Sequence, residues 1–155
     1  MITLGIDPGL SGALAFFNAD AGHLSIIDMP TVELKRNGKT KREVSAAQLA
    51  EFIRMGNVDH AYVEKVNAMP GQGVSSVFSF GRSTGMIEGV LAALKIRTTL
   101  VQPQVWQKAV GQRPGKDGSR QRAADLFPIY ANLFSRVMDN GRSDAALISW
   151  YGATR

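Results

Sequence analysis

The chain has 155 residues, 45% of them hydrophobic, so it is long enough to bury the core of one domain spanning residues 1–155. Lys and Arg number 18 against 13 Asp and Glu, and the resulting charge of +5 favours a polyanionic partner such as nucleic acid. The absence of cysteine excludes disulfides and thiolate metal sites, and no apolar run approaches the ~20 residues that span a bilayer.

The most informative stretch is ITLGIDPGLSG at residues 2–12, an apolar run that ends in a Gly-rich turn and contains one charged residue, Asp7. We expect residues 2–7 and the apolar residues 13–18 to pair as a hairpin, with Asp7 near its tight end. A carboxylate at the end of a buried strand is costly unless a cation or a hydrogen-bonding turn compensates it. Asp7 is therefore a turn former, a metal ligand, or part of a turn that cradles phosphate.

Residues 24–29 predict a third strand, so the first three strands form an antiparallel meander. The next segment, residues 33–43, concentrates positive charge without apolar periodicity, and we expect an exposed loop. It is either a solvated loop or a set of contacts to a phosphate backbone, because cations gain affinity there by releasing counterions. Its five cations are Lys35, Arg36, Lys39, Lys41 and Arg42.

Ser45 and Gln48 fit a capping box that begins a helix, and Gly56 fits the C-terminal stop of that helix. Residues 58–64 then predict a strand that ends in Glu64, the second carboxylate at the end of an apolar strand. Two such placements in a short chain are harder to explain as ordinary turns than one.

A long helix is predicted at residues 75–94, with glycine at every fourth position along one stripe. Each interior Gly costs about 1 kcal/mol relative to Ala, so the stripe indicates that another backbone comes close. The glycines either pack on the protein's own sheet or form the contact between two copies of the chain. The residues concerned are Gly81, Gly85 and Gly89, with Phe78 and Met86 filling the space around them.

The last third of the chain predicts a fifth strand at residues 97–101, a short helix at 103–110 and a helix capped by Ser119. A loop and a terminal helix follow, and the acids Asp139 and Asp144 lie in this final segment. Basic side chains gather between the fifth strand and the terminal helix. They are Lys108, Arg113, Lys116, Arg120 and Arg122.

The order of these elements predicts an α/β fold with a five-stranded mixed sheet of order 3-2-1-4-5 flanked by helices. The strands at 2–7 and 58–64 are then parallel neighbours joined by a crossover. Asp7 and Glu64 lie beside each other, and a terminal helix packed on the first strand brings Asp144 to them. Such a carboxylate cluster on a basic protein suits two-metal phosphodiester chemistry, and oxygen ligands favour Mg²⁺ or Mn²⁺ over Zn²⁺.

Three segments together resemble the RuvC-type Holliday junction resolvases, especially the branch from phages and organelles: GIDPG, then Glu64 with PGQGVSSVFSFG after it, then GRSDAALIS. The resemblance covers nearly the whole chain in the right order. It implies a ribonuclease H-like fold, a homodimer, and symmetric metal-dependent nicking of four-way junction DNA by a crossover junction endodeoxyribonuclease. Asp7, Glu64 and Asp144 match the family's acidic positions one by one. We expect no nucleotide cofactor and no membrane partner.

The family also uses the region between the fifth strand and the terminal helix for DNA. The resemblance therefore implies that the basic side chains gathered there line the DNA path near the active site. The phosphate-contact interpretation of the segment at 33–43 adds Lys39 and Lys41 to this set.

Two positions depart from the bacterial enzymes. Those enzymes often carry an acid or His three residues before the last Asp, where this chain has Gly141. We expect Asp139 to supply the missing ligand, with a carbonyl oxygen of Asn140 as the alternative and helix capping as the other role of Asp139. The bacterial enzymes also place an aromatic residue shortly after the Glu, where this chain reads Lys65, Val66 and Asn67.

Three other functions fit parts of this pattern. GIDPGLSG resembles the first phosphate loop of sugar kinases and actin-like proteins, but those proteins need a second domain that 155 residues are not expected to supply. A junction-binding protein without catalysis is disfavoured, because unpaired buried carboxylates are expensive. A nuclease of the same fold could act on RNA or on other branched DNA. With no signal-peptide pattern, we expect the protein in the cytoplasm of a bacterium or phage-infected cell, or in an organellar matrix.

Overall fold

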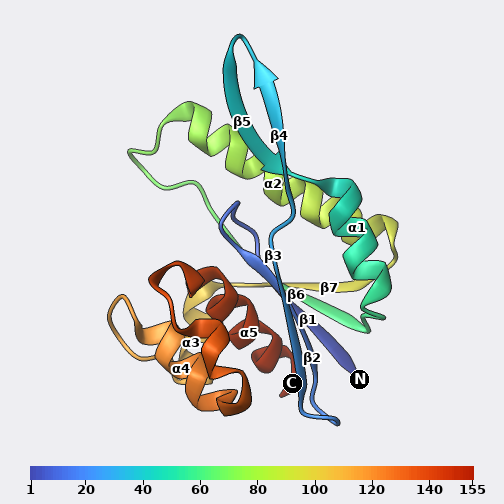
Figure 1. The fold of residues 1–155 in the computed structure, drawn as a ribbon, viewed down its shortest axis with the longest axis vertical. Coiled ribbons are helices and arrows are strands. Elements are labelled where there is room, and N and C mark those ends of the chain that lie inside the picture. The colour runs from blue at the N-terminus through green and yellow to red at the C-terminus, as the bar shows by residue number, and fades with distance from the viewer.

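The computed structural model describes all 155 residues and contains a five-stranded mixed sheet of order β3-β2-β1-β6-β7 (Figure 1). Strands β1, β2 and β3 are antiparallel neighbours, whereas β6 is parallel to β1 and to β7. This confirms the predicted sheet and its order. The strands are β1 at Ile2–Asp7, β2 at Ala13–Asn18, β3 at His23–Asp28, β6 at His60–Glu64 and β7 at Arg97–Val101.

Helices cover both faces of this sheet (Figure 1). One face packs against α1 at Ala46–Met55 and α2 at Val74–Ala93. The other packs against α3 at Pro103–Val110, α4 at Gly118–Leu126 and α5 at Asn140–Ala153. Two short 3₁₀ helices, Pro128–Phe134 and Val137–Asp139, connect α4 to α5.

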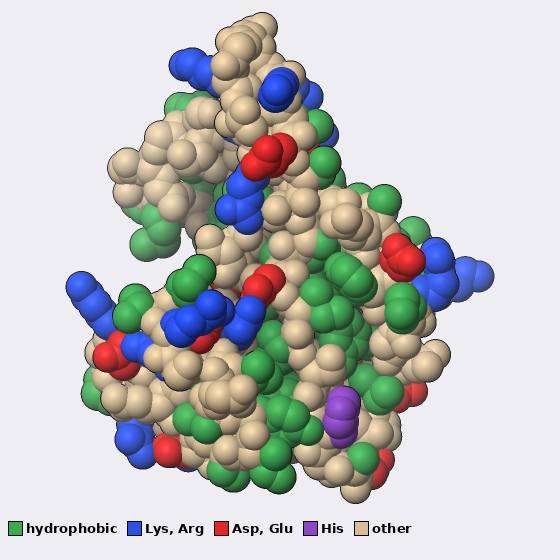
Figure 2. All heavy atoms as spheres, viewed as in Figure 1, with side chains coloured by type: hydrophobic (Ala, Val, Ile, Leu, Met, Phe, Trp, Pro, Cys, Tyr) green, Lys and Arg blue, Asp and Glu red, His purple; other side chains and the backbone are tan.

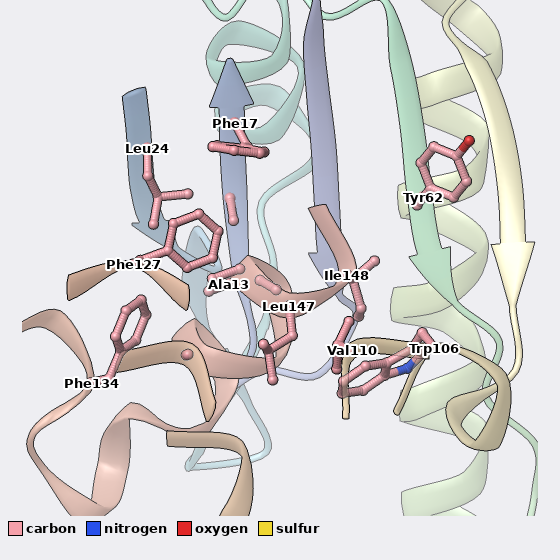
Figure 3. Close-up of a cluster of buried hydrophobic side chains, with 14 of the residues drawn as sticks. Ala13, Phe17, Leu24, Tyr62, Trp106, Val110, Phe127, Phe134, Leu147 and Ile148 are labelled. Atoms are coloured by element: carbon pink, nitrogen blue, oxygen red, sulfur yellow. The ribbon is translucent and has the colours of Figure 1, made fainter. Parts of the chain in front are cut away.

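The two-residue period of the strands divides the core into two clusters. Leu4 and Ile6 of β1 belong to the cluster under α1 and α2, with Leu49, Ile87 and Leu91 from those helices. The other cluster, drawn in Figure 3, joins β2 and β6 to the second helical layer. There Trp106 and Val110 of α3 pack near Leu147 and Ile148 of α5 (Figure 3).

Helix α1 begins after Ser45 and ends at Gly56 as predicted, but the capping box is only half formed, because the Ser45 N–H donates to the Pro30 carbonyl instead of to the Gln48 side chain. The Ser45 hydroxyl accepts a hydrogen bond from the Gln48 backbone N–H at 3.4 Å, and Gly56 ends the helix with its N–H bonded to the Phe52 carbonyl. Helix α4 differs from its prediction. It begins at Gly118, so Ser119 lies inside the first turn and makes no capping bond.

The segment at 33–43 is not a loop. It forms an antiparallel hairpin of β4 at Thr31–Arg36 and β5 at Lys39–Val44, in a second sheet of its own. Asn37 and Gly38 both have positive φ, 50° and 72°, the pair of left-handed residues that a type I′ turn requires. The expectation of a loop was wrong. The Asn37-Gly38 pair favours a hairpin turn, but the many charged residues around it hide the strand pattern.

The glycine stripe on α2 faces solvent rather than the sheet. A Cβ built at Gly81, Gly85 or Gly89 would have no atom within 4 Å, so the interpretation as packing on the protein's own sheet is wrong. Met86, in contrast, is half-buried against the monomer core. In none of the helices does the apolar length reach what crossing a membrane requires.

Candidate active site

Two parallel strands bring the first pair of acids together. Ile6 of β1 pairs with Val63 of β6, and Asp7 and Glu64 are the next residue of each strand. Because the carboxyl ends of parallel strands meet at one edge of a sheet, the two side chains share that edge. Both carboxylates are half-buried.

A helix supplies the third acid through unusually close packing. Gly5 lies directly beneath α5, where a Cβ would be 2.1 Å from the Ala145 carbonyl oxygen and 2.4 Å from the Ser149 nitrogen. Only glycine lets the helix backbone approach the strand this closely. Asp144 immediately precedes Ala145, so this contact sets its position at the end of β1.

Burial and mutual repulsion shift the pKa values of these acids upward. Burial raises the pKa of Asp7 to about 6, with a further contribution from the charge of Glu64. Burial, and then the charge of Asp7, raises the pKa of Asp144 to about 7 against an opposing hydrogen bond from Ser119. Burial also raises the pKa of Glu64. The three carboxylates therefore form one coupled cluster, although they come from distant parts of the chain.

No basic side chain compensates this cluster. None of the ion pairs in the structure includes Asp7, Glu64 or Asp144. Their oxygens are the ligand type that Mg²⁺ and Mn²⁺ prefer, and a divalent cation would remove the mutual repulsion. In this structure no three acidic or histidine side chains are arranged to bind one metal ion together. The donor chemistry and the uncompensated charge nevertheless fit such an ion.

The structure does not bring Asp139 to this cluster. Its carboxylate is 1% exposed and accepts hydrogen bonds from the Arg136 backbone N–H at 2.8 Å and from the Arg136 guanidinium. Arg142 lies 3.7 Å from the same carboxylate. The hydrogen bonds and charges of Arg136 lower the pKa of Asp139, the opposite direction from the three clustered acids. Asp139 therefore stabilises the turn before α5.

Gly141, three residues before Asp144, also lies near the carboxylate cluster. A Cβ built there would be 3.2 Å from Asp7 Oδ2, so the position does face the site. It would also lie 2.3 Å from the Ser11 carbonyl oxygen and 2.8 Å from Gly12 Cα. The backbone of the turn after β1 fills the space that a side chain at residue 141 would need.

The five predicted DNA-binding cations between β7 and α5 fall into two groups. Lys108 and Lys116 are exposed and make no ion pair. The three arginines have partners within the fold: Arg113 pairs with Asp125 at 2.7 Å, Arg120 with Asp117 and the Ser135 carbonyl, and Arg122 with the Val110 carbonyl. Arg120 and Arg122 are also half-buried. These two side chains link α4 to its neighbours.

Two further residues touch the acids and were missed in the sequence. The Trp106 indole N–H donates to Glu64 Oε2 at 2.9 Å, and the Ser119 side chain hydrogen-bonds Asp144. Trp106 of α3 is fully buried (Figure 3). Its hydrogen bond therefore holds Glu64 in one orientation. A Trp in a helix that begins directly after a strand was the available signal, but nothing local to it indicates a partner 42 residues away.

Comparisons with known proteins bear on the fold. No family model matches the chain, and no curated protein sequence matches it. Several solved structures, in contrast, have a similar fold. RuvC of T. thermophilus in complex with Holliday junction substrate has a TM-score of 0.68 at 12% identity, over 99% of this chain and 93% of that one.

One eukaryotic structure and one viral structure are also similar to this chain. The yeast mitochondrial Holliday junction resolvase Ydc2 has a TM-score of 0.54 at 16% identity, over 96% of this chain and 76% of that one. The fowlpox virus Holliday junction resolvase has a TM-score of 0.50 at 15% identity, over 99% of both chains. The chain therefore has the RuvC-type, ribonuclease H-like fold shared by these Holliday junction resolvases.

If the carboxylate cluster cleaves phosphodiesters, replacing Trp106 by Phe should slow that cleavage by about 10–100-fold, because it removes the N–H that orients Glu64 while keeping an aromatic ring in the core. Trp150→Phe is the matched control. Trp150 stacks on Phe17 at 5.5 Å between ring centroids and touches no acid of the cluster. Single-turnover rates with equal protein stability in both variants would test this, and a wild-type rate for Trp106→Phe would remove the positioning role.

The raised pKa values predict how stability depends on pH without metal. The folded protein holds more protons than the unfolded chain between about pH 4 and about pH 7, so its free energy of unfolding falls as pH rises through this window. Asp144→Asn should raise that free energy at pH 8 by about 1–3 kcal/mol in EDTA. Urea unfolding at pH 5 and pH 8 measures this, and Mg²⁺ should reduce the difference between wild type and variant.

Proposed function

We propose that the protein is a structure-selective, metal-dependent endonuclease that resolves four-way DNA junctions by symmetric nicking. The observation that carries the proposal is the cluster of three uncompensated carboxylates at the ends of β1 and β6 and on α5. The cluster belongs to a chain of net charge +5 whose fold is that of Holliday junction resolvases. DNA and the three acids are both negatively charged and repel each other. Cleavage of DNA at this cluster therefore requires cations bound between the acids and the phosphate.

Asp7, Glu64 and Asp144 would hold Mg²⁺ or Mn²⁺, with two ions as our proposal for each site. Such ions, when bound, activate the attacking water and stabilise the charge of the leaving oxygen. The Trp106 indole N–H fixes the direction of Glu64, so this ligand would meet an incoming ion already oriented.

The electrostatics weigh against a protein that only binds junctions. Burial raises the pKa values of all three acids, and the charge of Glu64 adds to the rise for Asp7 and Asp144. Holding these acids ionised destabilises the fold, and a pure binding role gives them no compensating partner. A nuclease for RNA or for other branched DNA would use the same acids, and only the choice of substrate separates it from a junction resolvase.

The surface around the acids is suited to DNA. Figure 2 shows blue basic side chains gathered beside red acidic ones on the lower lobe, next to a hollow between the two lobes. Lys108 of α3 and Lys116, just before α4, are exposed and form no ion pair, and we propose that they contact phosphates near the cleaved bond. Arg113, Arg120 and Arg122 would contribute mainly by shaping the lobe.

We further propose that the enzyme is a homodimer joined through α2. Positions 74, 78, 81, 85 and 89 are three or four residues apart and lie on one helical face. That face carries three glycines together with Val74, 87% exposed, and Phe78, 70% exposed. An exposed apolar stripe marks an interaction surface, and a two-fold dimer would present two sites to two symmetric strands.

Asp7→Asn, Glu64→Gln and Asp144→Asn should each abolish nicking of a synthetic junction in Mg²⁺ while the affinity for the junction stays within about threefold, because phosphate contacts to basic side chains supply most of the affinity. Gel shifts in EDTA and nicking assays on the same preparations separate binding from chemistry. Nicking at the wild-type rate by Asp7→Asn would exclude the metal-site assignment.

Gly85→Leu should block dimerisation and convert paired cuts into single, uncoupled nicks, because the new side chain occupies the helix contact. The monomer should stay folded, since nothing lies within 4 Å of that position. Ser76→Leu is the control: it is exposed on the same helix, nine residues and so about 180° away from Gly85. Sedimentation with circular dichroism checks both variants, and a dimeric Gly85→Leu protein would contradict the proposed interface.

A further inference from the structure

We propose that the β4–β5 hairpin is an arm that binds the DNA duplex several base pairs away from the cleaved bond. This inference rests on the proposed function. The hairpin stands out from the body of the molecule at the end far from the chain termini (Figure 1). Each strand has six residues, so the arm is about 20 Å long at ~3.4 Å per residue.

One face of the hairpin fastens it to α2. The Lys41 ammonium donates to the Ser79 hydroxyl at 3.2 Å, and Glu43 lies 3.7 Å from the Arg82 guanidinium. Leu34, directly opposite Lys41 in the register, is half-buried on the same face. The arm is therefore braced at its base, and its Asn37–Gly38 turn closes it tightly at the tip.

Three cations at the tip of the arm have no structural partner. Lys35, Arg36 and Lys39 surround the turn, are exposed, and form no ion pair. The two acids of the hairpin are Glu33 and Glu43, and Glu43 is already paired with Arg82. Figure 2 shows the blue side chains at the tip of the upper lobe. A tip that is cationic and nearly free of apolar side chains is complementary to a polyanion rather than to a protein surface.

The base of the arm lies next to the candidate active site. The Arg42 guanidinium donates to the Leu10 carbonyl at 3.5 Å and to the Thr31 hydroxyl at 3.3 Å. Leu10 belongs to the turn that directly follows Asp7. A duplex whose backbone reaches Asp7 therefore passes the arm. A two-stranded ribbon fits the major groove, which is about 12 Å wide, and a reach of about 20 Å corresponds to roughly six base pairs.

The test replaces the three free cations of the tip together, as Lys35→Gln, Arg36→Gln and Lys39→Gln. The matched control is Arg54→Gln, Lys95→Gln and Arg97→Gln, which removes the same charge from exposed residues without ion pairs. Arg97 is the first residue of β7 and pairs with His60, so it lies at the opposite end of the strands from Glu64. Junction affinity is measured from 0.05 to 0.3 M salt, and hydroxyl-radical footprints are recorded on the same four-way junction.

We expect the arm variant to bind on the order of a hundredfold more weakly at 0.1 M salt, with a salt slope smaller by about 0.9 for each lost phosphate contact. Its footprint should lose protection roughly six base pairs from the cut and keep protection at the cut. The control should match wild type in both measurements.

If the arm variant has the wild-type salt slope and footprint, the arm does not bind DNA, even if junctions are still cut. An equal loss of affinity in the control would also overturn the proposed arm, because the effect would then be one of net charge. A wild-type protein that binds no junction would instead refute the proposed function, so the two failures are distinguishable.

Discussion

The close contact between α5 and β1 at Gly5 is the constraint on which the site depends. A side chain at residue 5 would collide with the Ala145 carbonyl and the Ser149 nitrogen of α5. The helix would then move away from the strand and carry Asp144 with it. The same approach brings Gly141 onto the backbone of the turn after Asp7, which closes the site to a fourth side chain from that helix.

Hydrophobic burial is what holds mutually repelling acids together. Leu147 and Ile148 of α5 are fully buried, and each such side chain contributes about 1.5–3 kcal/mol. The raised pKa values of Asp7 and Asp144 indicate a repulsion and desolvation cost of a few kcal/mol, at about 1.4 kcal/mol for each pKa unit. The burial of these two side chains is therefore of the same order as the cost of Asp144 on the same helix, and the negative charge of the acids remains available for cations.

Much of the fold could be predicted because its signals are local. The apolar run of β1, the acids at the ends of β1 and β6, and the crossover between these strands fix the sheet order and unite Asp7 with Glu64. The segment at 33–43 was missed because its turn signal is two residues long inside a run of charge. The Trp106–Glu64 hydrogen bond was missed for a different reason, since it joins two elements whose contact exists only after the helices have packed on the sheet.

The most direct measurement compares three substrates for the wild-type protein in Mg²⁺: a synthetic four-way junction, a linear duplex of the same sequence, and a structured RNA. We expect paired nicks at symmetric positions in two opposing strands of the junction. We expect no cleavage of the duplex or the RNA at the same enzyme concentration, and no cleavage of any substrate in EDTA. Equal cleavage of the linear duplex or of the RNA, or cleavage that persists in EDTA, would contradict the proposed function.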